Sequence, residues 1–263
     1  MPHLFIFGLG YSAKRIQLAA EARGWLVSAT GQDAEFSFDD EAAVRGALEI
    51  ADYVLSSVPP GADGDPVLLR YGDALEQPWL GYLSSTGVYG DTGGAWVDES
   101  APIGTGRRSA RSEADSAWLA REARVFRLPG IYGPGRSALD RVSEGKAHRI
   151  DLPDQVFSRI HVDDLAAGVM AGVEAPAGAY NLADDQPSSQ NAVIEEACRL
   201  LGAPLPPLKS LEEAGLSPQA QAFYAENRRI ANGKAKRVLG WQPRHAEFRS
   251  GLRSCLASAR SGL

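Results

Sequence analysis

Two glycines and an alanine near the beginning of the chain follow a pattern that can hold a diphosphate. The stretch "FGLGYSAKR" fits G-x-G-x-x-A through Gly8, Gly10 and Ala13. The first glycine allows a tight turn, the second lets backbone approach a pyrophosphate, and the small third residue lets a helix pack on a strand. The helix that begins near Tyr11 and Ser12 offers free N–H groups to phosphates. Because the motif stands between an expected strand and an expected helix, it predicts dinucleotide binding. The alternative is a tight turn in a flavodoxin-like sheet that binds no dinucleotide.

The end of the next expected strand bears on which dinucleotide would bind. An acid about 20 residues beyond the glycines accepts the ribose hydroxyls of NAD. That position falls near Gly31 in "SATGQD", where neither an acid nor an arginine stands. Thr30 and Gln32 can hydrogen-bond either form of the cofactor. The missing acid removes a repulsion against a phosphate and favours NADP, unless Asp33 reaches the ribose from a longer loop.

Short apolar runs alternate with longer amphipathic segments and would position these residues. Strands are expected at 3–7, 25–30, 52–58, 79–86 and 124–130, and helices at 12–23, 39–49, 65–75 and 109–122. Ser12 is placed to cap the first helix. This alternation predicts an α/β fold with a doubly wound parallel sheet. Ligands collect beyond the carboxyl ends of such strands, that is, in the turns after Phe7, Thr30, Ser57, Ser84 and Leu128.

The sequence pattern changes after about residue 130, where the apolar and amphipathic segments become shorter and richer in proline. We therefore expect a first domain over 1–130 and a smaller second lobe over 131–263. Parts of the second lobe are expected to return to the first, so the boundary is soft.

The composition narrows the class of protein. The 263 residues carry a net charge of −6 without a dense basic run, which argues against nucleic acid and anionic membrane as partners. No leader-like or membrane-spanning stretch is visible, and a cytoplasmic location is expected. Cys198 and Cys255 stand in helix-like text and are expected to be buried free thiols. The four histidines show no paired ligand spacing, so no metal is predicted.

Further motifs follow in a fixed order: "DYVLSSVPP", "SSTGVYGDTGGAWVDESAP", "FRLPGIYGPGR", "RIHVDDLAAG" and "YNLADDQPSS". With the glycine turn, they make the chain resemble the extended short-chain dehydrogenase/reductase superfamily, and within it the atypical group called NAD-dependent epimerase/dehydratase-like. The resemblance covers almost the whole chain. It implies a Rossmann domain that binds NAD(P) and a C-terminal α/β lobe for a small-molecule substrate, often a nucleotide-sugar.

The resemblance also assigns residues. Ser85 matches the family's Ser/Thr that hydrogen-bonds the reacting oxygen. Positions expected to contact the cofactor, besides Gly8, Gly10, Tyr11, Ser12, Ala13, Thr30 and Gln32, are Ser57, Val58, Pro59, Ser84, Pro129, Gly130 and Ile131.

The chain departs from the family at its catalytic pair. The family has Tyr and Lys in Y-x-x-x-K, where the tyrosine acts as acid or base and the lysine lowers its pKa. Here those positions fall on Arg107 and Arg111, and no tyrosine stands between Tyr89 and Tyr132. A guanidinium cannot be deprotonated near neutrality, but it can stabilise an oxyanion or bind a carboxylate or phosphate. Tyr89 and Tyr132 are expected to be packing residues with tethered hydroxyls.

Two functions remain open. The chain is either an NAD(P)-dependent oxidoreductase or epimerase-like enzyme with a non-standard proton donor, or a cofactor-binding sensor or scaffold without turnover. His161 and Asp163 are expected to cap a helix rather than to catalyse. Arg136 and Arg159 are equally explained as grips for an anionic substrate or as solvated arginines. The sequence does not decide between a monomer and a homodimer.

Overall fold

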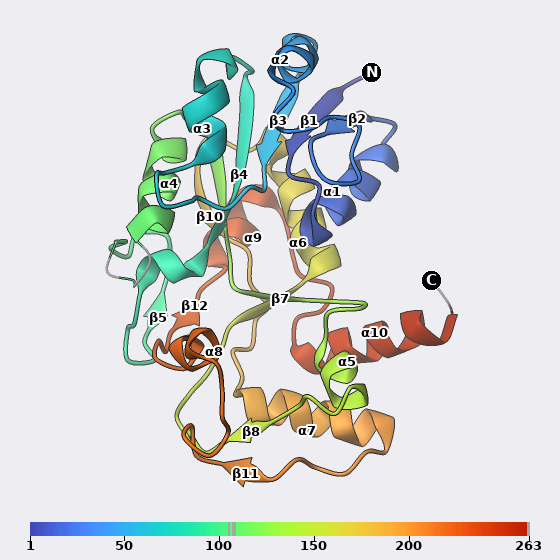
Figure 1. Ribbon diagram of the computed structural model, residues 1–263, viewed down its shortest axis with the longest axis vertical. Helices are drawn as coiled ribbons and strands as arrows, with labels where there is room; N and C mark the ends of the chain where they lie inside the picture. Colours follow the sequence, from blue (N-terminus) through green and yellow to red (C-terminus); the bar gives the residue numbers. More distant parts are fainter. Residues whose placement is uncertain (105, 107–108, 262–263) are drawn as a thin grey trace.

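A central sheet of six strands, all parallel, organises the molecule (Figure 1). The structure is a computed structural model that describes residues 1–104, 106 and 109–261. The strand order is β10-β6-β4-β3-β1-β2, with bounds β1 His3–Phe7, β2 Leu26–Ala29, β3 Tyr53–Ser56, β4 Trp79–Ser85, β6 Arg124–Leu128 and β10 Gly178–Asn181. Every residue of β1 is buried, as an apolar run inside a parallel sheet predicts.

Helices cover both faces of this sheet. One apolar cluster joins the sheet to α1 (Tyr11–Glu21) and α6 (Val162–Ala171), with α9 (Gly233–Leu239) beside them. A second cluster joins the other face to α2 (Glu41–Glu49), α3 (Pro66–Tyr71) and α4 (Ser109–Leu119). The doubly wound Rossmann-like α/β fold predicted from the alternation of segments is confirmed.

The remaining elements lie mostly beyond the carboxyl ends of the sheet strands, in the lower part of Figure 1. Helices α5, α7 and α10 pack around a third apolar cluster. Three two-stranded parallel pairs, β5–β12, β7–β9 and β8–β11, connect distant segments. The bounds are α5 Ala138–Ser143, α7 Gln190–Leu201, α8 Pro218–Phe223, α10 Phe248–Ser261, β5 Trp96–Val97, β7 Gly130–Tyr132, β8 Arg149–Ile150, β9 Arg159–His161, β11 Leu208–Lys209 and β12 Arg229–Ile230, with 3₁₀ turns at Gly72–Ala74, Thr86–Tyr89 and Gly172–Glu174.

Segments from the second half of the chain return to the central sheet. Strand β10 pairs with β6, and α6 packs against α1. Cys198 and Cys255 are both buried free thiols, as expected. Within the described residues, no helix combines the length and apolar character needed to cross a membrane.

Candidate cofactor and substrate site

The glycine turn stands where the strand order reverses, between β1 and β3. Gly8 has a φ of +84°, a conformation that side chains rarely adopt, and a Cβ there would lie 3.0 Å from Val58 Cγ2. The Ser57 hydroxyl donates to the Gly8 carbonyl oxygen, and the Gly8 N–H donates to Thr30 Oγ1 at 3.1 Å. The first residue of the motif is therefore a glycine because the end of β3 packs directly against it. In open α/β sheets, such a reversal point is where ligands bind.

Helix α1 begins directly after the turn, and its N-terminus is open. Gly10 is the N-cap and has no side-chain capping bond, so the expectation that Ser12 caps the helix is wrong. Ser12 lies inside the first turn, because the chain is already helical from Tyr11. A Cβ built on Gly10 meets nothing within 4 Å. Backbone N–H groups at the start of α1 are thus left for an outside acceptor.

A cavity of about 520 Å³ extends from this turn across the carboxyl ends of the strands. It collects candidate residues from four separate turns of the sequence. Those lining it are Gly10, Tyr11, Ser12, Ala13, Ser57, Pro59, Ser84, Ser85, Arg111, Pro129, Gly130 and Ile131. We call this space the dinucleotide cavity.

Four candidates do not line the cavity. Gly8 and Val58 shape the turn behind its wall. Thr30 is 1% exposed and its hydroxyl accepts from Gly8, so its observed contact is with the turn. Gln32 is exposed on the loop beyond β2. Arg107 lies outside the described residues.

A second cavity of about 430 Å³ opens beside the first, among α5, α7, β9 and α10. The two cavities share Gly130, Ile131, Arg136 and Phe223 as lining residues. The second one is walled largely by apolar side chains, with Arg159 and Gln190 among the polar groups. We call it the substrate cavity.

Comparison with known proteins identifies this architecture. No protein-family model matches the sequence. A solved, functionally unknown conserved protein from Silicibacter pomeroyi is 38% identical, with a TM-score of 0.88 over 98% of this chain and 99% of that chain. MoeE5, solved with UDP-glucose and NAD, gives a TM-score of 0.80 at 17% identity over 99% of both chains. A human epimerase family protein, solved with NADPH, gives 0.78 at 15% identity over 97% and 99%. The chain has the extended short-chain dehydrogenase/reductase fold, and it belongs to the family of the Silicibacter protein.

Two curated relatives also match this short-chain dehydrogenase/reductase chain. A Streptomyces protein named 3-diazoavenalumate denitrifying reductase is 35% identical over 143 residues, 49% of this chain. The match spans only 45% of that reductase. Protein YeeZ of Escherichia coli K12 is 28% identical over 254 residues, 82% of this chain and 89% of the relative.

Neither Tyr89 nor Tyr132 is among the residues that line the dinucleotide cavity. Tyr89 donates to Asn181 Oδ1 at 2.8 Å and accepts from Arg127 at 3.0 Å, and burial raises its pKa. The expectation that its hydroxyl is tethered is confirmed. Tyr132 is a buried packing residue, as expected. Its hydroxyl has no recorded hydrogen-bond partner, so the expectation that this hydroxyl is tethered is wrong. Its ring packs edge-on against the buried ring of His161, with the ring centroids 5.3 Å apart.

Arg111 and Ser85 are among the polar groups that line the dinucleotide cavity. Arg111 stands in the first turn of α4, where the helix dipole disfavours a cation. Local helix stability therefore does not explain this charge. Ser85 Oγ accepts the N–H of Gly87 at 3.1 Å, so the serine does stabilise its own turn. Its O–H proton has no acceptor among the recorded bonds of the described residues and is directed elsewhere.

A buried ionic network behind the cavity was missed by the sequence analysis. Asp115, fully buried, accepts from Ser84 at 2.6 Å and from Arg127 at 2.7 and 3.0 Å. The bond to Tyr89 continues the network to Asn181, whose N–H donates to Glu99 at 2.7 Å. An arginine in the middle of the apolar strand "RVFRL" was the available signal, because a buried guanidinium requires acceptors. The Ser84 hydroxyl is thus committed to Asp115.

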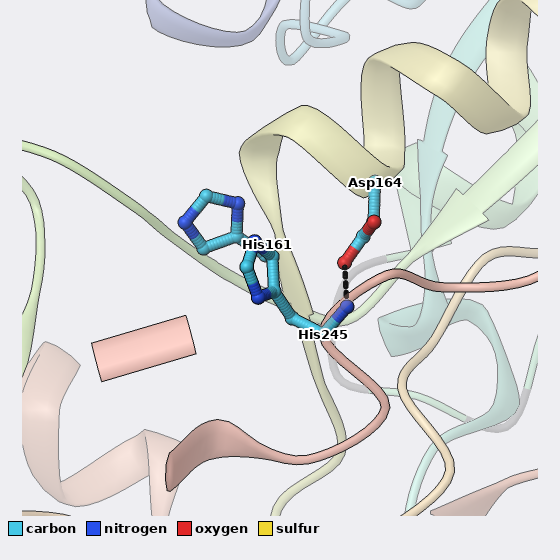
Figure 2. Close-up of side chains that lie close together, drawn as sticks. All are labelled: His161, Asp164 and His245. Carbon is cyan, nitrogen blue, oxygen red and sulfur yellow. Dashed lines mark hydrogen bonds between the residues drawn. The ribbon is translucent and has the colours of Figure 1, made fainter. Parts of the chain in front are cut away.

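His161, Asp164 and His245 also meet in the interior, although 84 residues separate the two histidines (Figure 2). One possible ligand atom of each lies within 4.8 Å of the others. Both Asp164 oxygens accept backbone N–H groups, of Arg244 at 2.7 Å and His245 at 2.9 Å, which fastens the segment before α10 to α6. His161 caps α6 by accepting from Asp163 N at 3.3 Å, as expected. Burial lowers the pKa of His161 to about 4, so it is neutral at pH 7.

Proposed function

We propose that the chain is an NAD(P)-dependent oxidoreductase, epimerase/dehydratase-like, that acts on a small polar substrate without the usual Tyr/Lys pair. The observation that carries this proposal is the pair of adjoining cavities with shared lining at Gly130, Ile131, Arg136 and Phe223. A protein that only senses a dinucleotide needs the first cavity. An enzyme also needs a second chamber that opens onto the reactive end of the cofactor. The nucleotide-sugar and cofactors held by MoeE5 and the human epimerase family protein support the same division.

The residues present fit a dinucleotide. Open space above Gly10 admits a pyrophosphate at the uncapped start of α1. Ser57 and Pro59 would face the ribose part, and Pro129–Ile131 would face the nicotinamide. We further propose a cytosolic protein, because both cysteines are free thiols.

NADP is the cofactor that we propose over NAD. Asp33, the acid nearest to the ribose position, is exposed and forms a 3.6 Å ion pair with Lys14 of α1. That pairing partly neutralises the carboxylate and supplies a cation near the adenosine ribose, where NADP carries its phosphate. Comparing the dissociation constants of the two cofactors by calorimetry tests the preference.

The chain's own groups allow a reaction scheme without tyrosine. A bound nicotinamide would supply or accept a hydride. Arg111 keeps a permanent positive charge at the same end of the cavity as Ser85, where it can stabilise an oxyanion. Ser85 accepts from Gly87 and can direct its O–H toward the reacting oxygen. Proton transfer through a tyrosine would be worth roughly 10²–10⁴ in rate, so we expect a slower enzyme than relatives that keep the pair.

Gly10→Ala is the experiment that tests cofactor binding. The backbone at Gly10 has a φ of −87°, and a Cβ meets nothing, so the variant should fold normally. The methyl group would occupy the space where the pyrophosphate approaches, and we expect at least about a tenfold loss in NADPH affinity, equal to about 1.4 kcal/mol. Gly46→Ala, a helical glycine of α2 with the same open surroundings, is the matched control.

Calorimetric titration with NADPH and NADH, alongside thermal unfolding, reads out both variants. An unchanged NADPH affinity in Gly10→Ala would contradict the assignment of the turn. Turnover of sugars, aldehydes and ketones by the cofactor-loaded protein then separates the enzyme from an inactive sensor, which would bind the cofactor and transfer no hydride.

The variant Arg111→Gln tests whether the positive charge of Arg111 contributes to cofactor binding. Removing its charge from the cavity wall should weaken NADPH binding by about tenfold, because charge-assisted bonds to phosphate or ribose are lost. Arg111→Lys should recover part of this loss. Arg121→Gln, just beyond the other end of α4 and bonded to the Gly72 carbonyl, is the control and should bind as the natural chain does. Equal affinities for all three variants would remove Arg111 from the site.

A further inference from the structure

Arg159 is a buried cation that the fold leaves without a counter-ion. It lies in β9, is 7% exposed, and lines the substrate cavity. Its guanidinium donates to the carbonyl oxygens of Phe157 and Ser188, each at 2.8 Å, and to Gln190 Oε1 at 3.1 Å. All three acceptors are uncharged. Within the described part of the chain, no carboxylate oxygen forms an ion pair with Arg159.

Arg127 shows what the same fold does with a buried arginine that serves structure alone. It is 3% exposed, and Asp115 binds it with two oxygens. Burying an unpaired charge is costly, whereas a bidentate carboxylate offsets much of that cost. The pKa of Arg127 is accordingly raised, whereas burial lowers the pKa of Arg159 to about 10. Arg159, unlike Arg127, thus lacks an anionic partner that would offset the cost of burying its charge.

The carboxyl group of Asp184 does not supply this anionic partner. Its backbone N–H donates to the Arg159 carbonyl oxygen at 2.7 Å, but the carboxyl group lies outside ion-pair distance. The group is 1% exposed, and neither oxygen accepts a hydrogen bond of good geometry, although the nearby backbone N–H of Gln186 favours the ionised form. Burial raises its pKa to about 8, so at neutral pH it is mostly protonated. The pair therefore carries a net positive charge.

Two acids, Asp140 and Glu144, and two further arginines, Arg136 and Arg141, also line the cavity, so with Arg159 the wall carries an excess of positive charge. Asp140 is occupied by the N–H and hydroxyl of Ser137 at 2.7 and 2.6 Å, and Glu144 pairs with Lys146 at 2.9 Å. Arg136 lines both cavities with its guanidinium over the Tyr11 ring. Each acid on this wall thus has hydrogen-bond or ion-pair partners nearby, whereas among the described residues the arginines of the wall have no carboxylate ion-pair partner.

Aromatic surfaces adjoin this charge. The rings of Phe157 and Phe223 stack with centroids 4.5 Å apart and planes at 8°, and both line the cavity together with Phe248. Phe223 is half exposed and also lines the dinucleotide cavity. A flat apolar body can lie against these rings while an anionic group reaches inward.

We propose that Arg159 binds the oxyanion of the substrate, a carboxylate or a phosphate carried on a partly apolar body that packs against the phenylalanine wall. This assignment rests on the proposed function, in which the adjoining cavity holds the dinucleotide. It makes Arg159 a specificity-determining residue: the uncharged analogue of the true substrate would leave the buried guanidinium unpaired and be rejected.

The test uses the full chain and three probes at constant ionic strength: inorganic phosphate, 3-phenylpropanoate, and the uncharged 3-phenylpropanamide. We expect saturable stabilisation in thermal unfolding with one or both anions and none with the amide. Binding of phosphate alone identifies a phosphorylated substrate; binding of phenylpropanoate identifies a carboxylate. Absence of any saturable response to about 50 mM anion, or an equal response to the amide, overturns the proposal.

Variants place the anion at Arg159. Arg159→Gln should lose at least about tenfold in anion affinity, about 1.4 kcal/mol, and Arg159→Lys should retain part of it. Arg124→Gln is the control, because Arg124, like Arg159, donates to uncharged acceptors and does not line the substrate cavity. Retained NADPH binding in Arg159→Gln with loss of the anion response supports the proposal, whereas an unchanged anion response overturns it. If the natural chain does not bind NADPH, the proposed function itself is refuted.

If Arg159→Gln does not fold, Asp184→Asn supplies the second test. Above pH 8, ionised Asp184 competes with an added anion for Arg159, so anion affinity in the natural chain should fall as pH rises from 7 to 9. Asp184→Asn removes the competitor, so its affinity for 3-phenylpropanoate, whose charge does not change in this range, should fall much less. Equal pH profiles for the two proteins would overturn the role of Arg159.

Discussion

Asp115→Ala is expected to lower the free energy of unfolding by about 3–5 kcal/mol, because it strands a buried guanidinium. Asp115 is fully buried and is the only carboxylate among the described residues that pairs with Arg127. Without it, Arg127 keeps its bonds to neutral groups but loses its counter-ion, and the Ser84 hydroxyl loses its acceptor. Urea unfolding at pH 7, followed by circular dichroism, measures the change.

A double variant distinguishes a lost charge partner from lost packing. Asp115→Leu combined with Arg127→Met replaces both charges by apolar groups of similar length. Buried ion pairs replaced in this way are often neutral or stabilising, so the double variant should be more stable than Asp115→Ala. Ser84→Ala removes only one neutral donor and should cost about 1 kcal/mol. An Asp115→Ala cost below about 1 kcal/mol would show that water reaches Arg127 and that the network is not closed.

This network also explains why we do not propose Tyr89 as a proton donor. Its hydroxyl is held between Arg127 and Asn181, and the guanidinium lies 5.1 Å from its ring centroid. A hydroxyl that donates to one partner and accepts from another inside the protein is directed away from a ligand. For this reason our proposed reaction scheme uses Arg111 and Ser85 instead.

The conformation of the glycine turn could be predicted from the sequence because its constraints are local. Gly8 has a positive φ and a Cβ on Gly10 would meet nothing within 4 Å, and both features appear in the sequence as glycines at fixed spacing. The strand-end turns that carry Ser57 and Pro129 follow from the alternation of apolar and amphipathic segments. Parallel strands bring such turns to one edge whatever the details of packing.

The environments of the two buried arginines could not be predicted, because they depend on which carboxylates the fold brings near each guanidinium. Arg127 and Arg159 both stand in short apolar strands, and nothing in their neighbouring letters separates them. Only the fold shows that Asp115 reaches the first and that no described carboxylate pairs with the second. In the same way, His161 and His245 become neighbours only when α10 is fastened to α6.

Asp184→Asn is expected to stabilise the fold at alkaline pH, which is the reverse of what loss of a salt bridge would do. The folded-state pKa of Asp184, about 8, exceeds its ordinary value of 3.8. Between these two values the folded protein holds a proton that the unfolded chain releases, so stability falls as pH rises from about 4 to about 8. At about 1.4 kcal/mol per pH unit, the rise from 3.8 to about 8 means that burial of this carboxyl costs on the order of 6 kcal/mol by pH 8. An amide of the same shape carries no such cost.

The difference in unfolding free energy between Asp184→Asn and the natural chain isolates this group. It should be near zero at pH 4 and grow to a few kcal/mol in favour of the variant at pH 8. The comparison must be a difference, because neutral buried His161 acts in the opposite direction. Its pKa of about 4 makes both proteins lose stability as pH falls from about 6.5. If Asp184→Asn were instead less stable at pH 8, Asp184 would be ionised and paired with Arg159. Arg159 would then not be an unpaired cation in the substrate cavity.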